Sequence, residues 1–211
     1  NPMPKLILFN KPFGVLSQFR PDEGNDFSTL ADFFTDKTLR VAGRLDATSE
    51  GLLLLTNDGQ INHALTAPPK VLNQKAHQAK KQGKTYWIHL DGRASDGQIE
   101  QLAKGVLLKD GMTLPALVEP LCEGQISQLW QAPEAIAKRK ITSWLSITIF
   151  EGKNRQVRRM TAHVGLPCLR LVRVASSGFD IIECGLGVGE WREVDLTKAD
   201  LARLGVSRFS Y

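Results

Sequence analysis

The stretch GRLDATSEGLLLLTNDG, residues 43–59, largely decides the fold of this protein. Four consecutive leucines, Leu52–Leu55, lie between Gly51 and the turn-forming run Asn57-Asp58-Gly59. A short apolar run with turn residues on both sides is typical of a buried strand. Asp46 comes before this strand, and no helix starts close enough for it to cap. The stretch therefore predicts a carboxylate on a tight loop at the start of a core strand.

Asp46 has two interpretations at this point. A turn or capping aspartate is the usual one for a single residue of this kind. The other is a chemical role, since Thr48 and Ser49 could orient the carboxylate and an arginine could keep it ionised. Arg44 is a candidate for a neighbouring charge, because residues two apart in an extended segment point to the same side. Leu45 would then anchor the loop in the core.

Composition excludes several classes of protein. The 211 residues suffice for one large or two small domains, with ordinary globular proportions of 42% hydrophobic and 23% charged residues. No apolar stretch approaches the roughly 20 residues of a membrane-spanning helix, so we expect no membrane partner. Three widely spaced cysteines fit a reduced, cytoplasmic protein better than a disulfide framework or a zinc site.

The basic residues are clustered. The formal net charge is only +5, but residues 70–84 contain five lysines and no acid. Two smaller patches without acids follow at 137–140 and 155–160. A single charge run is usually solvated surface, whereas three such patches in one chain favour a phosphate-binding surface.

The remaining pattern predicts an α+β protein with a mostly antiparallel sheet. Strand signals outnumber helix signals, and turn residues separate several strands. We expect strands that begin near residues 6, 84, 144, 168 and 190, and a hairpin around 109–111. We expect helices over 28–34 and 58–65, from Ser95 to Gly105, over 154–164 with Asn154 as its cap, and from Thr197.

No common catalytic motif is present, and no metal or nucleotide cofactor is expected. GLGVG at 185–189 lacks the helix that a dinucleotide loop needs. The helix over 154–164 carries Arg155, Arg158 and Arg159 near its N-terminus, where cations oppose the helix dipole. This placement favours an external anion or an internal carboxylate as partner. By composition and position alone, Tyr86 is an ordinary residue of a strand.

Four stretches together carry a resemblance to a known family. They are NKPFGVLSQ, GRLDATSEGLLLLTNDG, KTYW, and EGKNRQVRRM followed by LRLVRVASSGF. In this order and spacing the sequence resembles the RsuA-type pseudouridine synthases from about Leu6 to about Ile182. Such enzymes commonly carry an N-terminal S4 RNA-binding domain, but here the motifs begin at once, so we expect none.

The resemblance implies a fold and an activity. The fold would be the α+β pseudouridine synthase catalytic domain, a mixed, mostly antiparallel sheet with a central active-site cleft. A single domain over 4–206 would form two lobes that flank this cleft. The activity would be isomerisation of uridine to pseudouridine in RNA, most simply large-subunit ribosomal RNA, by a monomer without cofactor or metal.

The resemblance also implies roles for individual residues. Asp46 would be the nucleophile, Tyr86 would stack on the target base and help to remove the C5 proton, and Arg158 would keep Asp46 ionised. Arg44 would fill the gap that the extruded uridine leaves. The candidates for contacts with RNA phosphates are Lys11, Lys153 and Arg155. By residue type alone, Lys11 before Pro12 is instead a surface lysine at a turn.

Two alternatives stay open. One is a non-catalytic RNA-binding or ribosome-assembly factor on the same fold, which the basic patches would serve equally well. It would not need Asp46, Tyr86 and Arg158 together. The other is a glycosidase that pairs Asp46 with Glu50 or Glu151, since two carboxylates are the usual requirement for sugar-bond hydrolysis.

The run VLNQKAHQAKKQGK, residues 71–84, leads to the first prediction. We expect this lysine-rich segment to help to dock RNA through its phosphates. Deleting residues 72–82 should weaken RNA binding and flatten its dependence on salt concentration, because fewer counterions are released on binding. Titration of RNA at several salt concentrations tests this, and unchanged binding would contradict it.

Overall fold

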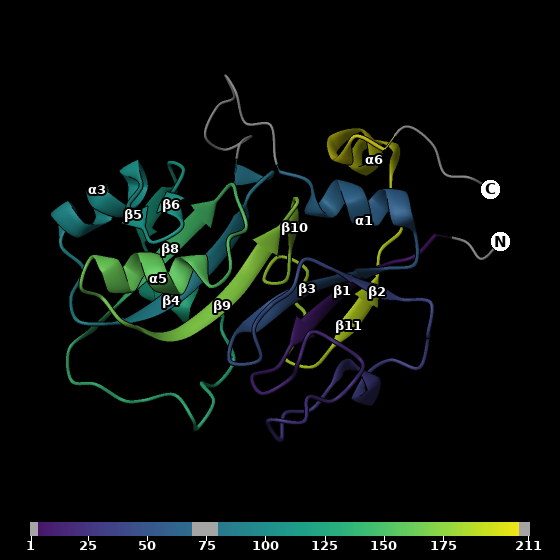
Figure 1. Ribbon diagram of the computed structural model, residues 1–211, viewed down its shortest axis with the longest axis horizontal. Coiled ribbons are helices and arrows are strands. Elements are labelled where there is room, and N and C mark those ends of the chain that lie inside the picture. Colours follow the sequence, from purple (N-terminus) through teal and green to yellow (C-terminus); the bar gives the residue numbers. More distant parts are fainter. Residues whose placement is uncertain (1–3, 69–79, 207–211) are drawn as a thin grey trace. The chain divides into compact units, whose positions relative to one another are not determined.

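The computed structural model describes residues 4–68 and 80–206. Most of the basic run at 70–84 lies outside these residues. The chain forms two compact units: unit 1 comprises residues 1–67 and 183–211, and unit 2 comprises residues 68–182. Figure 1 labels most of the elements of both units. The expectation of one domain over 4–206 stays a prediction.

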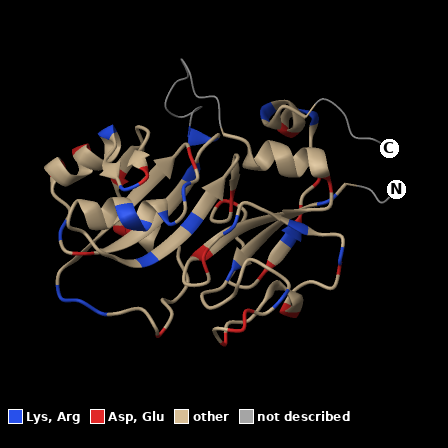
Figure 2. Ribbon diagram, viewed as in Figure 1, with Lys and Arg blue, Asp and Glu red and all other residues tan. Residues whose placement is uncertain are grey.

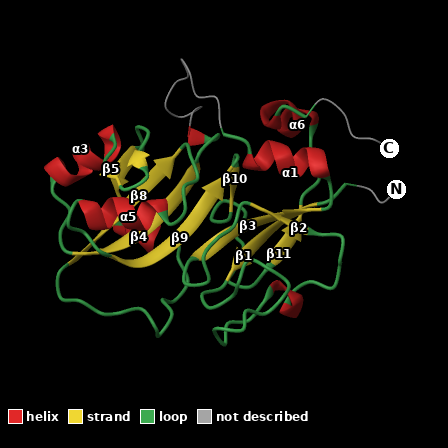
Figure 3. Cartoon of the chain, viewed as in Figure 1, coloured by secondary structure: helices red, strands yellow, loops and turns green. Residues whose placement is uncertain are grey.

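Unit 1 is built on an antiparallel sheet (Figure 3). Strand β1, Leu6–Lys11, lies between β3, Glu50–Thr56, and the short β11, Trp191–Glu193. The three-residue strand β2, Arg40–Ala42, pairs with β3. All seven residues of β3 are buried, which confirms the leucine run as a core strand.

Two helices and one helical turn complete unit 1. Helix α1, Gly59–Thr66, begins as expected, because the side chain of Asp58 accepts hydrogen bonds from the first turn. Helix α6, Lys198–Leu204, begins at a capping box. The helix expected over 28–34 is wrong in length: only Leu30–Asp32 are helical, as a 3-10 turn. The rings of Phe33 and Phe34 instead pack on Phe9, with centroids 4.9 and 5.1 Å away.

Unit 2 has a larger antiparallel sheet, in which each strand pairs with the next in the order β9, β4, β8, β7. The strands are β4 (Lys84–Asp91), β7 (Leu117–Pro120), β8 (Thr142–Ile149) and β9 (Cys168–Ser176), with β10 (Phe179–Asp180) paired to β9. The expected hairpin is present as β5 (Leu107–Leu108) and β6 (Gly111–Met112). The prediction of a mostly antiparallel α+β fold is confirmed.

The two faces of the unit 2 sheet carry different side chains. Along β4, alternation places Tyr86, Ile88 and Leu90 on one face and Trp87 and His89 on the other. The second face is covered by the segment that follows β7, which includes α4 (Glu123–Ile126). The hydrophobic residues packed around Trp87 are Leu121, Leu129, Trp130, Trp144, Val172, Val174, Ala175 and Ile182.

Two helices lie beside one another in unit 2. Helix α3, Asp96–Lys104, begins at the predicted capping box of Ser95 and Gln98. The Gln98 side chain donates to the carbonyl of Val164, just after helix α5, Gln156–His163. Arg158 of α5 donates to the Cys168 sulfur, 3.7 Å away, and Cys168 lies opposite Leu90. Helix α5 therefore covers the face of the sheet that carries Tyr86.

The start of α5 differs from the prediction. Asn154 does not cap the helix; the N-cap is Arg155, in the left-handed conformation with φ 51°. The carbonyl of Asn154 accepts a hydrogen bond from Nε of Arg159 at 3.0 Å, which holds the chain one residue before the cap. The end of the helix at Gly165, with φ 86°, agrees with the prediction.

No described helix is long and apolar enough to cross a lipid bilayer.

The burial of β3 gives a prediction about stability. Leu53 is fully buried opposite Phe9, so Leu53→Ala should lower the free energy of unfolding by about 2–5 kcal/mol. Urea denaturation measures this change. Leu107 is 67% exposed, and the matched Leu107→Ala variant should stay within about 0.5 kcal/mol of the wild type. Equal losses in both variants would contradict the placement of β3 in the core.

Candidate active site

The loop that carries Asp46 is fixed by hydrogen bonds from the segment that follows β1. Leu45 is buried, its N–H donates to Oγ of Ser17 at 3.0 Å, and the Ser17 hydroxyl donates in turn to the Leu45 carbonyl. On the other side of Asp46, the carbonyl of Ala47 accepts from the N–H of Gly14 at 2.7 Å. Both neighbours of Asp46 are thus held in place.

Asp46 itself opens a turn, since its carbonyl accepts from the N–H of Ser49 at 3.0 Å. Its side chain is half-buried, whereas Arg44 is exposed and donates to the Gln18 side chain at 3.1 Å. The expected pattern, with Leu45 in the core between two charged residues, is confirmed. A carboxylate on a turn whose flanking residues are fixed moves little, as a nucleophile requires.

The position of Lys11 differs from the one expected. It was expected as a surface lysine, but it ends strand β1 fully buried, with 0% of its surface exposed. Its ammonium donates to the carbonyls of Pro12 and Val15 at 2.8 Å each and, more weakly, to that of Ala47 at 3.4 Å. A buried ammonium needs such acceptors. In this structure Lys11 supports the loop of Asp46 and does not present its charge to a phosphate.

Tyr86 lies on β4 of unit 2, between two cross-strand neighbours. Ile147 of β8 is on one side and Arg173 of β9 on the other, both directly opposite Tyr86. Directly opposed residues in antiparallel strands share a face of the sheet. Only 8% of Tyr86 is exposed, and Arg173 is buried. An arginine and an aromatic ring are therefore neighbours on the face that α5 covers.

Arg158 projects from α5 toward the same face. Besides its contact with Cys168, it influences the thiol: burial raises the pKa of Cys168, and the charges of Arg158 and Arg155 oppose this shift. Both arginines thus lie within electrostatic reach of Cys168. Arg155 is exposed at the start of the helix, where a partner from outside the protein can reach it.

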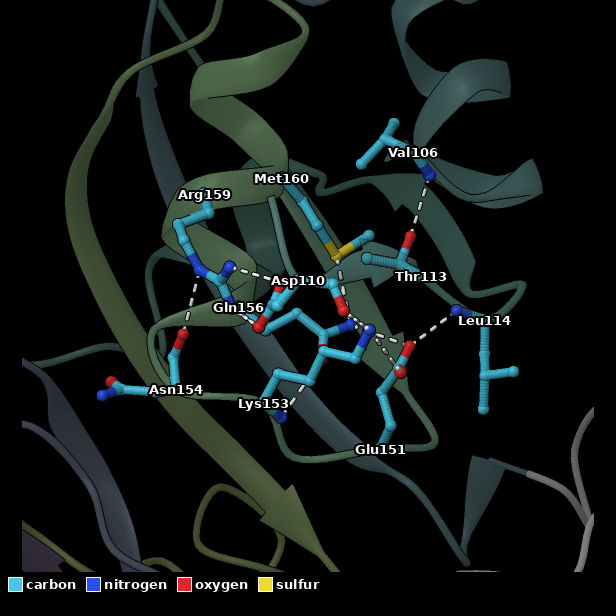
Figure 4. A network of polar contacts seen from close by, with 10 residues as sticks. All are labelled: Val106, Asp110, Thr113, Leu114, Glu151, Lys153, Asn154, Gln156, Arg159 and Met160. Atoms are coloured by element: carbon cyan, nitrogen blue, oxygen red, sulfur yellow. Dashed lines mark hydrogen bonds and ion pairs between the residues drawn. The ribbon is translucent and has the colours of Figure 1, made fainter. Parts of the chain in front are cut away.

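The N-terminus of α5 is clamped to the β5–β6 hairpin (Figure 4). The guanidinium of Arg159 donates to both carboxylate oxygens of Asp110, at 2.7 and 3.1 Å. This hydrogen bond from Arg159 holds the pKa of Asp110 below its usual value. One member of the predicted arginine cluster therefore has an internal carboxylate as partner. Asp110 was not among the expected site residues, because a turn aspartate in a hairpin gives no signal of a distant partner.

Glu151 forms the second part of this clamp (Figure 4). Its Oε2 accepts from the N–H of Leu114 at 2.6 Å and from the Gln156 side chain at 2.9 Å. The Gln156 oxygen accepts from the N–H of Lys153 at 3.3 Å. The ammonium of Lys153 lies 4.0 Å from Glu151 and 3.5 Å from the carbonyl of Asp110. The clamp fixes the segment from which Lys153, Arg155 and Arg158 project.

The glycosidase alternative gains no support from these contacts. Glu151 holds two donors of its own unit, and Glu50 is 1% exposed at the start of β3. A general acid for sugar-bond hydrolysis must instead reach its substrate. Among the described residues, no group of three or more His, Cys, Asp or Glu side chains could hold a metal ion.

Unit 2 also presents positive charge outside α5 (Figure 2). The predicted patch at 137–140 includes Lys138, Arg139 and Lys140, all exposed. Arg139 lies 3.3 Å from the carboxylate of Asp91, an ion pair at the surface. Lysines on such a surface can contact the phosphates of RNA.

Comparison with known proteins identifies the family. A family model described as RNA pseudouridylate synthase matches residues 5–163, which include Asp46, Tyr86 and Arg158. The chain belongs to this family. It is thus an enzyme of the pseudouridine synthase type, an isomerase that acts on RNA, and the resemblance noted in the sequence is confirmed.

Individual relatives are similar over most of the chain. Ribosomal large subunit pseudouridine synthase E of Vibrio vulnificus is 48% identical over 91% of this chain and 76% of its own length. The protein of the same name from Xanthomonas campestris is 45% identical over 94% of this chain and 100% of its own. Ribosomal large subunit pseudouridine synthase B of Bacillus subtilis is 34% identical over 95% of this chain and 71% of its own length.

Solved structures agree on the fold. The crystal structure of a pseudouridylate synthase matches 95% of this pseudouridine synthase and 74% of its own chain, with a TM-score of 0.69 and 28% identity. A chain of an H/ACA RNP bound to a substrate RNA matches at 16% identity, with a TM-score of 0.51 over 83% of this chain and 48% of its own. This second likeness shows a shared fold alone.

The clamp at α5 leads to a prediction. Glu151→Ala leaves the N–H of Leu114 and the Gln156 side chain without their acceptor, so it should lower the free energy of unfolding by about 1–3 kcal/mol. Glu151→Gln is the matched control, because a single amide oxygen can accept both hydrogen bonds. Its stability and isomerase activity should stay close to the wild type. Loss of activity in Glu151→Gln with stability intact would indicate a chemical role for this carboxylate.

Proposed function

We propose that this pseudouridine synthase converts one specific uridine of large-subunit ribosomal RNA into pseudouridine, with Asp46 as the nucleophile. The observation that carries the proposal is the loop of Asp46, whose two neighbours are held by Ser17 and Gly14 within the region of the family match. The choice of RNA is supported by the names of the relatives that are 45% and 48% identical.

The reaction fits a single fixed carboxylate. The C1′–N1 bond breaks, and positive charge builds on the sugar, which the ionised side chain of Asp46 stabilises or traps. The detached uracil leaves as a delocalised anion, turns, and forms a C1′–C5 bond. The proton on C5 is lost and N1 gains one, so the product is an isomer of uridine. Nothing is oxidised or reduced, and we expect neither a cofactor nor a metal.

Two residues of unit 2, and Arg44 of unit 1, are proposed to supply the other roles. Tyr86 stacks on the target base and helps to remove the C5 proton, and Arg158 keeps the carboxylate of Asp46 ionised. The aromatic ring of Tyr86 beside Arg173 and the position of Arg158 on the face that α5 covers support these assignments. Arg44 fills the gap left by the extruded uridine, a role that its exposed position supports.

The RNA is proposed to lie along basic side chains of unit 2. Arg155 and the lysines at 138 and 140 are exposed, and Lys153 is half-buried at the start of the same helical segment. Contacts of this kind hold the RNA backbone without reading its sequence. We propose that the protein acts as a monomer in the cytoplasm, where ribosomal RNA is made in bacteria.

Release of tritium from RNA labelled at C5 of uridine tests the proposal. The substrate is large-subunit ribosomal RNA from cells that lack this protein. The wild-type enzyme should release about one equivalent per RNA, because isomerisation must expel the C5 hydrogen. Asp46→Asn should release none while it binds the same RNA, since the amide retains the shape of the side chain and loses its charge.

Other results would change the proposal. Full activity in Asp46→Asn would exclude this residue as the nucleophile. Tight binding of ribosomal RNA without any release by the wild-type protein would favour the alternative, a binding factor on the same fold. Sequencing of the product for pseudouridine identifies the modified position.

A further inference from the structure

Lys84 is a partly buried cation that the proposed reaction does not use. It is the first residue of β4, between Ile149 of β8 and Ser176 of β9. Its ammonium lies against Gly152, where a Cβ added to the glycine would be only 3.0 Å from Nζ. Glycine at 152 therefore leaves space for the ammonium next to the segment that leads into α5.

The surroundings of Lys84 disfavour its charge. Burial, followed by the charge of Arg173, lowers the pKa of Lys84 to about 8. Within residues 4–68 and 80–206, its ammonium has no hydrogen bond or ion pair. A lysine that is partly withdrawn from water is stabilised by such a partner. Since none of the described residues supplies one, an anion from outside the protein can take this place.

The position of Lys84 relates it to Tyr86. Residues two apart on a strand point to the same face, so Lys84 and Tyr86 are neighbours on the face that α5 covers. Arg173 lies directly opposite Tyr86 and has interactions of its own. Two cationic residues therefore lie on the same face of the sheet as the aromatic ring, Lys84 two residues along the strand and Arg173 on the neighbouring strand. An anion beside the ring would be attracted by both.

A phosphate fits this position better than the reacting base. The uracil carries negative charge only while the reaction proceeds, whereas every nucleotide of RNA carries a permanent phosphate charge. A nucleotide stacked on Tyr86 can place its backbone along the strand that holds the ring. Lys84 is at the end of that strand, two residues before the tyrosine.

We propose that Lys84, together with the charge of Arg173, binds one RNA phosphate next to the uridine that stacks on Tyr86. This site depends on the proposed function. The bound phosphate would supply a charge-assisted hydrogen bond, which no described residue gives to the ammonium. It would also fix the register of the RNA strand relative to the tyrosine, because a phosphate contact positions the backbone without reading a base.

Binding of the ribosomal RNA fragment that contains the modified uridine tests the site. Lys84→Gln should bind about ten-fold more weakly than the wild type, the loss of one contact to a charged group. The slope of log Kd against log salt concentration should fall by about 0.7, which corresponds to one phosphate on single-stranded RNA. The rate at saturating RNA should stay within roughly twofold, since a contact made equally before and during the reaction changes KM and not kcat.

Lys104→Gln is the matched control in the same unit. Lys104 is exposed and pairs with Glu100 at 2.7 Å, four residues earlier in α3. The Lys104→Gln variant should bind RNA with nearly the affinity of the wild type and with nearly the same dependence on salt concentration. Lys84→Met adds a test of folding: removal of a partly buried charge that has no partner among the described residues should leave the melting temperature unchanged or higher. A large fall would mean that Lys84 stabilises the fold, which contradicts the proposal.

Fragments with a neutral methylphosphonate at single positions locate the phosphate. One substitution beside the target uridine should weaken binding to the wild type and have no further effect on Lys84→Gln. Additive losses at every position would overturn the proposal, as would a lower kcat with an unchanged salt slope. Failure of the wild type to release tritium would instead overturn the proposed function, and the binding measurements would remain interpretable.

Discussion

A carboxylate that is to attack a sugar, the role proposed for Asp46, must be ionised, exposed to its substrate and held still. The protein meets the last requirement through the backbone on either side of Asp46, which accepts and donates hydrogen bonds to the segment after β1. The buried strand β3 anchors the far end of the same loop. Strand β1 connects these two parts of unit 1, since it pairs with β3 and leads into the segment whose Gly14 and Ser17 hold the loop.

Lys11, which is buried in the core, also holds the loop of Asp46. A fully buried ammonium is normally unfavourable, and here three carbonyl groups compensate for the loss of water. Unit 2 holds its own candidate site residues, the arginines of α5, in a different way. A hairpin tip and a glutamate hold the N-terminal segment of α5, so that its arginines project from a fixed backbone (Figure 4). Both solutions place charged groups on well-anchored segments.

Much of this arrangement could be predicted from local sequence. The leucine strand, the caps at Asp58, Ser95 and Thr197, and the hairpin are each specified by a few adjacent residues. The errors came from contacts between distant segments. Lys11 has the local pattern of a turn lysine, and only its carbonyl acceptors show that it is buried. Asn154 has the pattern of a helix cap, but its position is set by Arg159 and the hairpin. The partners of Asp110 and Glu151 could not be predicted for the same reason, since Glu151 was considered only as a carboxylate of a glycosidase.

Unit 1 is assembled from both ends of the described chain, since residues 183–211 join residues 1–67 while unit 2 is continuous. Strand β11 pairs with β1, the strand that precedes the loop segment holding Asp46. During synthesis the ribosome releases the N-terminal part first. The strand that pairs with the outer side of β1 is therefore absent until residues 191–193 have emerged. The unit that carries Asp46 is completed only after all of unit 2 has been made.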